Sequence, residues 1–80
     1  MKEVFIKKYW KEGDVLFYLH FQNGVAIRQI EITSNAKLFL TSSSPQKDNS
    51  MLYDQSIDEL DLEETDFITE DHFNKIWNER

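Results

Sequence analysis

The stretch VLFYLHFQNGVAIRQIEIT, residues 15–33, carries two runs rich in β-branched and aromatic residues on either side of Asn23-Gly24. A two-residue Asn-Gly loop favours a type I′ turn, because both central residues need a positive φ angle and Asn and Gly tolerate that angle best. The stretch therefore predicts a β-hairpin, with one strand over residues 15–22 and the next over residues 25–33.

The length of this loop also predicts how the two strands pair. An unbroken ladder sets Leu19 opposite Arg28, on the face of the sheet that holds the odd-numbered residues of the first strand. Those odd residues are wholly apolar: Val15, Phe17, Leu19 and Phe21. We expect them to form the core face, since burying them leaves no polar group unpaired. We also expect the ladder to stay unbroken, with Arg28 reaching an edge or a carboxylate. The alternative is a β-bulge near Arg28 and Gln29, in which one extra residue moves the following side chains to the opposite face of the sheet.

Two further strands flank the hairpin. EVFIKKYW at residues 3–10 predicts an opening strand, followed by a turn at residues 11–14 in which Gly13 offers the left-handed conformation. After a turn at residues 34–36, KLFLT at residues 37–41 predicts a fourth strand. The order of these runs predicts a four-stranded antiparallel β-meander.

A short helix closes the chain. Thr69 is placed to cap a helix over residues 70–78, with His72 as its third residue and with Ile68 and Phe73 as a hydrophobic staple. Phe73, Ile76 and Trp77 form one apolar stripe. Because an isolated helix of this length is marginal in water, we expect it to dock on the face formed by Phe17, Leu19 and Ile30. The predicted fold class is thus α+β.

The segment between the fourth strand and the helix is mostly polar and acidic. Residues 41–50 read as a loop, and residues 51–53 as a short strand or a core plug. Ser56 to Glu59 has the spacing of a capping box and predicts one helical turn. We expect Ile57, Leu60 and Leu62 to anchor this segment, with its carboxylates pointing outward because unpaired buried charge is too costly.

The second face of the sheet is more apolar than exposure to water would warrant. It holds Phe5, Tyr9, Leu16, Tyr18 and Ile27. Either residues 51–68 cover this face or a partner does, and we expect the chain itself to cover it.

Length and composition indicate one small domain over residues 1–80. The chain has no cysteine, so neither a disulfide framework nor a thiolate site is available. Charges interrupt the N-terminal residues, which lack the apolar core of a signal peptide, and no run approaches a membrane span of about 20 apolar residues. These features favour a cytoplasmic protein that does not associate with membranes.

The net charge of −6 is divided unevenly along the chain. Residues 1–47 hold seven basic and four acidic side chains, whereas residues 48–80 hold eleven acidic and two basic ones. Between residues 54 and 71 there are nine carboxylates and no basic side chain. Such a separation of charge bears on partners and association rates rather than on the fold.

The residue types that carry catalysis or bind metals are sparse. The two histidines, His20 and His72, lie on different predicted elements, and His20 is expected to pack by its ring on the second face. A calcium loop starting at Asp54 fails, because Glu59 replaces the turn glycine and Thr65 the final glutamate. We therefore expect no catalytic residues, no metal, no cofactor and no enzymatic activity.

Direct nucleic-acid binding is also disfavoured. Basic residues do alternate with aromatic ones, as on sheets that hold single strands, at Lys7, Lys8, Lys11 and Arg28. The acidic last third of the chain would oppose phosphate, and core packing explains the aromatic residues equally well.

Four segments, in order, resemble a family of small bacterial domains without a characterised function. They are FIKKYW at residues 5–10, RQIEI at residues 28–32, DQSIDEL at residues 54–60 and ITEDHFNKIW at residues 68–77. The resemblance spans nearly the whole chain, which departs from it in a Ser/Asn-rich middle loop and a shorter acidic segment. Small acidic domains of this type resemble immunity proteins, which neutralise a cognate toxin domain.

The resemblance and the charge together imply a basic partner protein, such as a toxin or nuclease domain. The residues expected to bind it are Asp58, Glu59, Asp61, Glu63, Glu64, Asp66 and Tyr18. The alternative is a phage- or plasmid-borne anti-defence protein whose carboxylates mimic nucleic-acid phosphates. In either case we expect a monomer or a weak homodimer.

Overall fold

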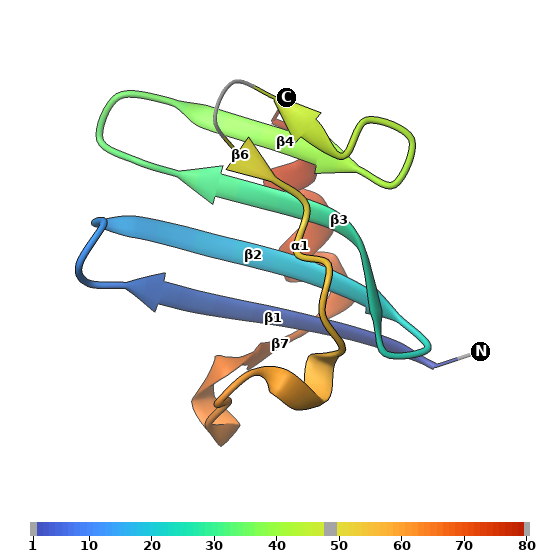
Figure 1. Ribbon diagram of the computed structural model, residues 1–80. Coiled ribbons are helices and arrows are strands. Elements are labelled where there is room, and N and C mark those ends of the chain that lie inside the picture. The colour runs from blue at the N-terminus through green and yellow to red at the C-terminus, as the bar shows by residue number, and fades with distance from the viewer. Residues whose placement is uncertain (1, 48–49, 80) are drawn as a thin grey trace.

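The computed structural model describes residues 2–47 and 50–79, which form an antiparallel sheet with one short helix on one face (Figure 1). The sheet has the order β4-β3-β2-β1-β7. Its strands are β1 (Glu3–Trp10), β2 (Val15–Gln22), β3 (Val25–Ile32), β4 (Lys37–Thr41) and β7 (Phe67–Ile68). The remaining elements are the paired strands β5 (Gln46–Lys47) and β6 (Ser50–Met51), the 3₁₀ turns η1 (Ile57–Glu59) and η2 (Glu64–Asp66), and helix α1 (Glu70–Trp77).

The α+β class is confirmed, but the expected number of strands is wrong. The main sheet has a fifth strand, because β7 returns to the edge of β1 and pairs Ile68 with Phe5 and Phe67 with Ile6. Residues 41–50, expected as a loop, contribute to the separate β5–β6 pair as far as they are described. Both additions are only two residues long, too short for an alternation of apolar and polar residues to reveal.

The β2–β3 turn is confirmed as a left-handed two-residue turn. Asn23 has a φ angle of 53° and Gly24 one of 86°, as a type I′ turn requires. The backbone N–H of Asn23 donates to the carbonyl of Lys2 at 2.9 Å, and the side-chain Oδ1 of Asn23 accepts from the N–H of Lys2 at 3.1 Å. The turn therefore also holds the start of β1.

The turn at residues 11–14 differs from the prediction. The left-handed residue is Asp14, with a φ angle of 51°, and not Gly13. Gly13 instead leaves room for the indole of Trp10, which lies 2.4 Å from where a Cβ atom would stand. The Tyr9 hydroxyl donates to Asp14 Oδ1 at 2.5 Å, and this hydrogen bond spans the turn.

The unbroken β2–β3 ladder is also wrong, because β3 contains a bulge. Phe21 faces Ala26, but His20 faces Arg28, so Ile27 is the extra residue. The bulge alternative is correct, although the extra residue precedes Arg28. The bulge places the long polar side chain of Gln29 opposite Leu19 and moves Arg28 to the face that holds His20.

Both faces of the sheet are buried, and α1 lies on the face opposite to the one expected. It packs on the even-numbered side chains of β2, so its docking on Phe17 and Leu19 is wrong. The core on this face consists of Phe5, Tyr18, Ile30, Phe73 and Trp77. Because of the bulge, Ile30 faces Tyr18 and no longer shares a face with Leu19. The chain itself thus covers much of the second face, mainly through α1 with Ile68 beside it, while Tyr9 stays exposed.

Residues 52–62 cross the other face of the sheet, where the yellow and orange part of the ribbon lies in front of the strands (Figure 1). Leu52, Tyr53, Ile57, Leu60 and Leu62 pack there against the buried Ile6, Leu19, Phe21 and Ala26. The prediction that the apolar side chains of this segment anchor it is confirmed, and residues 51–53 combine the end of a short strand with a core plug.

The predicted helix cap is confirmed. The side chain of Thr69 accepts a hydrogen bond from the backbone N–H of His72 at 3.1 Å, and α1 begins at Glu70. Phe73 and Trp77 are buried, and Ile68 is partly buried against the same core. Among the described residues, no helix is long and apolar enough to cross a membrane.

Candidate functional site

The acidic strap, which we define as residues 54–66, starts beside the β2–β3 turn. Ser56 bridges to Val25, and the N–H of Ile57 donates to the carbonyl of Gly24 at 3.0 Å. The Ser56 hydroxyl accepts from the N–H of Asp58 at 3.2 Å and caps η1. The predicted helical turn is therefore present, as a 3₁₀ turn.

Most carboxylates of the strap point into solvent. The exposed ones among the predicted residues are Asp58, Glu59, Asp61, Glu63 and Glu64. They point outward because Ile57, Leu60 and Leu62 occupy the inward positions of the same short segment. Among the described residues, the structure shows an ion pair for only one of the six predicted acidic side chains, that of Asp66.

Asp66 holds the strap to β1. Its Oδ2 accepts from the N–H of Glu63 at 2.8 Å and lies 3.2 Å from Nζ of Lys8, which also donates to the carbonyl of Asp61 at 2.7 Å. The Glu63 N–H lowers the pKa of Asp66 most, burial raises it by less, and the Lys8 ammonium lowers it further. Asp66 is thus a structural member of the strap, and the other five carboxylates are its open surface.

Tyr18 does not belong to this surface. Its side chain is 6% exposed and lies beneath α1, with its ring centre 5.9 Å from that of His72. Burial raises the pKa of its phenol. The structure therefore brings six of the seven predicted residues together on the strap and separates Tyr18 from them, because the even face of β2 is covered by the helix.

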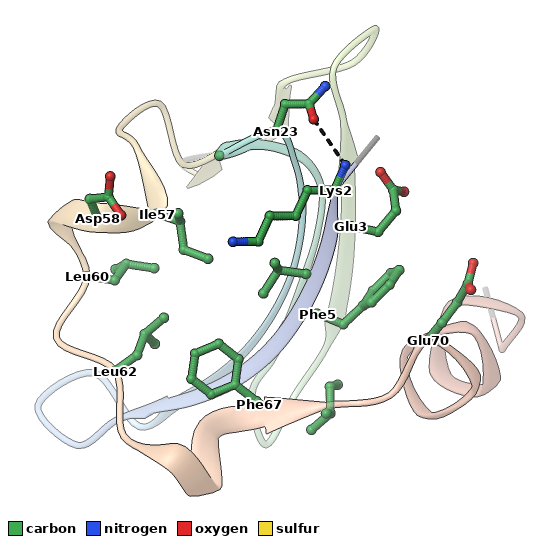
Figure 2. A pocket seen from close by; sticks show the side chains of 13 residues that line it. Lys2, Glu3, Phe5, Asn23, Ile57, Asp58, Leu60, Leu62, Phe67 and Glu70 are labelled. Carbon is green, nitrogen blue, oxygen red and sulfur yellow. Dashed lines mark hydrogen bonds between the residues drawn. The ribbon is translucent and has the colours of Figure 1, made fainter.

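A recess of about 1000 Å³, which we call the edge groove, lies between the strap and β7 (Figure 2). Its other boundaries are the first residues of β1, the β2–β3 turn and the start of α1. Apolar lining comes from Val4, Ile57, Leu60, Leu62, Phe67 and Ile68. Sequence reasoning missed this groove because it depends on β7 returning to β1, and the only local signal was the apolar pair Phe67-Ile68 between the acidic residues and the helix cap.

A polar chain of three side chains lies beneath α1. Nε2 of His20 is 2.7 Å from Oε1 of Glu3, and Nδ1 of His20 accepts from Nε of Arg28 at 2.8 Å. Because Arg28 donates to Nδ1, that nitrogen carries a lone pair, and the proton of the neutral ring is on Nε2. Burial lowers the pKa of His20 most, Arg28 lowers it further, and the hydrogen bond to Glu3 opposes both.

This chain supports the fold rather than catalysis. The His20 ring is 5% exposed and stacks on Phe5, with ring centres 4.3 Å apart, as expected for packing on that face. Both of its nitrogens have partners within the chain, so the ring joins Glu3 on β1 to Arg28 on β3. The guanidinium of Arg28 lies 4.7 Å from the ring centre of Phe73 and 5.0 Å from that of Trp77, and cation–π contacts hold α1 there.

Within residues 2–47 and 50–79, no three His, Asp or Glu side chains converge in a way that could hold a metal ion. The strap carboxylates diverge on an exposed surface, so they provide long-range attraction rather than a coordination site.

The chain matches no model of a known protein family, and neither the curated proteins nor the solved structures include one with significant similarity. The resemblance to small bacterial domains and immunity proteins therefore stays a prediction.

Proposed function

We propose that this protein is a non-enzymatic inhibitor that binds a basic partner protein through the acidic strap, in the manner of an immunity protein that blocks a nuclease-like toxin. The observation that carries the proposal is the outward display of five carboxylates on a segment whose apolar side chains are packed on the sheet. Within the part of the chain that the structure describes, Asp66 is the one predicted residue that forms an ion pair with a lysine.

The physical basis is electrostatic steering of the partner toward the strap. A dense patch of one charge raises the rate at which an oppositely charged surface meets it, to about 10⁸ M⁻¹s⁻¹ at low salt. A nuclease cleft that binds phosphate is basic, and a rigid acidic surface can fill it without any catalytic group. Rim charges of this kind set the rate and the specificity, while affinity comes from a few buried contacts.

The first test is co-expression of the chain with the products of the genes that flank its own, followed by native mass spectrometry of the purified material. A stoichiometric complex with a basic, toxic protein supports the proposal. A complex with a nuclease of a host defence system would instead favour the alternative of a nucleic-acid mimic.

The second test reverses charge on the strap. Replacing both Asp61→Lys and Glu64→Lys should slow association with that partner about tenfold at low salt, and this difference should shrink as salt is added. Stopped-flow measurements give the rates. The matched control is the double variant Glu12→Lys and Asp71→Lys, which changes the net charge equally at exposed positions outside the strap. Equal rates for the two double variants would remove the strap from the interface.

A further inference from the structure

We propose that the edge groove receives an arginine or lysine side chain, flanked by apolar residues, from an extended segment of the basic partner. This inference rests on the proposed function and makes it more specific, since it names the place where affinity, rather than attraction at a distance, would arise. The groove lies beside the strap and shares Ile57, Asp58, Leu60 and Leu62 with it.

The walls of the groove are apolar and partly uncovered. Ile57 and Leu60 form one side and Phe67 the other, and Figure 2 shows their side chains facing a common space. Phe67 is 50% exposed although it belongs to a strand of the sheet. A recessed apolar surface of this kind gains free energy when an aliphatic stem or an apolar side chain displaces its water.

The charges around the groove select a cation. Three carboxylates from three elements line it, those of Glu3 on β1, Asp58 on η1 and Glu70 on α1. The one cationic lining residue among those described is Lys2, just before β1, whose exposed side chain reaches into the groove and has to move aside for an incoming cation (Figure 2). Arginine and lysine combine an apolar stem with a charged end, which matches apolar walls beneath an acidic rim.

The edge of β1 favours an extended segment over an isolated side chain. The carbonyl of Lys2 accepts from Asn23, so the backbone groups of even-numbered residues there point toward β2. By alternation, the N–H and C=O of Glu3 point to the opposite edge, where β7 pairs only at Phe5 and Ile6. These two groups of Glu3 are the ones with which the backbone of an entering extended segment can pair beside the groove.

The test uses three short peptides with capped ends, titrated into the ¹⁵N-labelled full-length chain and followed by nuclear magnetic resonance. In the first peptide valine alternates with arginine, in the second glycine alternates with arginine, and in the third valine alternates with glutamate. The valine–arginine peptide should shift the amide signals of Val4, Leu60 and Phe67. It should bind about tenfold more tightly than the glycine–arginine peptide, which has equal charge.

Two variants and two matched controls locate the site. Phe67→Ser and Glu70→Gln should each weaken the valine–arginine peptide by about threefold to tenfold. Met51→Ser removes another exposed apolar side chain, which lies outside the groove, and Glu64→Gln removes an equal charge on the strap. Neither control should change the affinity by more than about twofold.

Three results would overturn the proposal that the edge groove binds the basic segment. In the first, the two arginine peptides bind with equal affinity and shift only the signals of the exposed acidic residues of the strap. In the second, the valine–glutamate peptide binds as tightly as the valine–arginine peptide. In the third, the valine–arginine peptide does not bind. The first leaves the proposed function intact, because the strap would still attract a basic partner. The proposed function itself fails only if charge reversal on the strap leaves association unchanged.

Discussion

Gln29 shows how one buried polar side chain joins two parts of the chain. It is 3% exposed, yet its amide donates to the carbonyl of Met51 at 3.1 Å and to Glu31 at 2.7 Å, and accepts from the N–H of Tyr53 at 2.7 Å. The hydrogen bonds of Gln29 to Met51 and Tyr53 depend on the bulge, because the bulge places Gln29 opposite Leu19, on the face of the sheet that residues 52–62 cross.

Replacing Gln29→Leu should lower the free energy of unfolding by about 2 kcal/mol, because the carbonyl of Met51 and the N–H of Tyr53 lose partly buried hydrogen bonds. Urea denaturation measures the change. Gln55→Leu, at an exposed position, should cost less than about 0.5 kcal/mol. A Gln29→Leu chain as stable as the parent would show that water replaces the lost hydrogen bonds.

At the scale of elements, the predictions that are confirmed concern features with a local cause, and those that are wrong concern features set by distant parts of the chain. The Asn23-Gly24 turn and the Thr69 cap are each determined within four residues, and both are confirmed. The bulge at Ile27 is determined by which face Arg28 and Gln29 can occupy, which depends on a helix and a strap far away in sequence. The choice of face for α1 failed for the same reason.

For the candidate site, the inward aliphatic residues and outward carboxylates of the strap follow from residue type, and the structure places them so. The edge groove does not follow, because two residues of β7 create it by pairing with β1. Tyr18 lies apart from the strap because α1 covers the face of the sheet to which Tyr18 belongs.

The docking of α1 should depend on pH through His20. The pKa of the folded-state ring is lowered from its ordinary value of 6.5, mainly by burial, so the unfolded chain takes up a proton at higher pH than the folded one. The stabilisation is therefore complete above pH 6.5 and is lost as the pH falls through the folded-state pKa. Protonation of Nδ1 would also set a proton against Arg28 Nε and disturb the contacts of Arg28 with Phe73 and Trp77.

Urea denaturation between neutral and mildly acidic pH tests this. The free energy of unfolding should decrease below pH 6.5 in the parent chain. His20→Gln should flatten this profile. Glu3, whose pKa is lowered from 4.5 mainly by its hydrogen bond to His20, acts in the same direction at lower pH. A profile equally steep in His20→Gln would contradict the assignment.

At the scale of the whole molecule, the fold separates charge from packing. Two apolar layers, one under α1 and one under the strap, hold the sheet, while the excess negative charge lies on residues 54–71 with few internal partners. Like charges on one surface repel, which lowers stability at low ionic strength.

Raising the salt concentration from about 10 mM to about 150 mM should therefore stabilise the parent chain by up to about 1 kcal/mol, since screening shortens the range of this repulsion to about 8 Å. The double variant Asp61→Lys and Glu64→Lys should be more stable at low salt and respond less to added salt. Thermal denaturation at two salt concentrations measures both. Identical salt responses would mean that the strap carboxylates do not repel one another appreciably.

The extra residue in β3 also predicts which change of length the strand tolerates. Deleting Ile27 would remove the bulge and leave a regular ladder, in which Arg28 still faces His20 and Gln29 still faces Leu19. The contacts of Gln29 with Tyr53 and of Arg28 with Phe73 would therefore be kept in a chain one residue shorter. The sheet requires the pairing of Arg28 and Gln29 with β2, and not residue 27 itself.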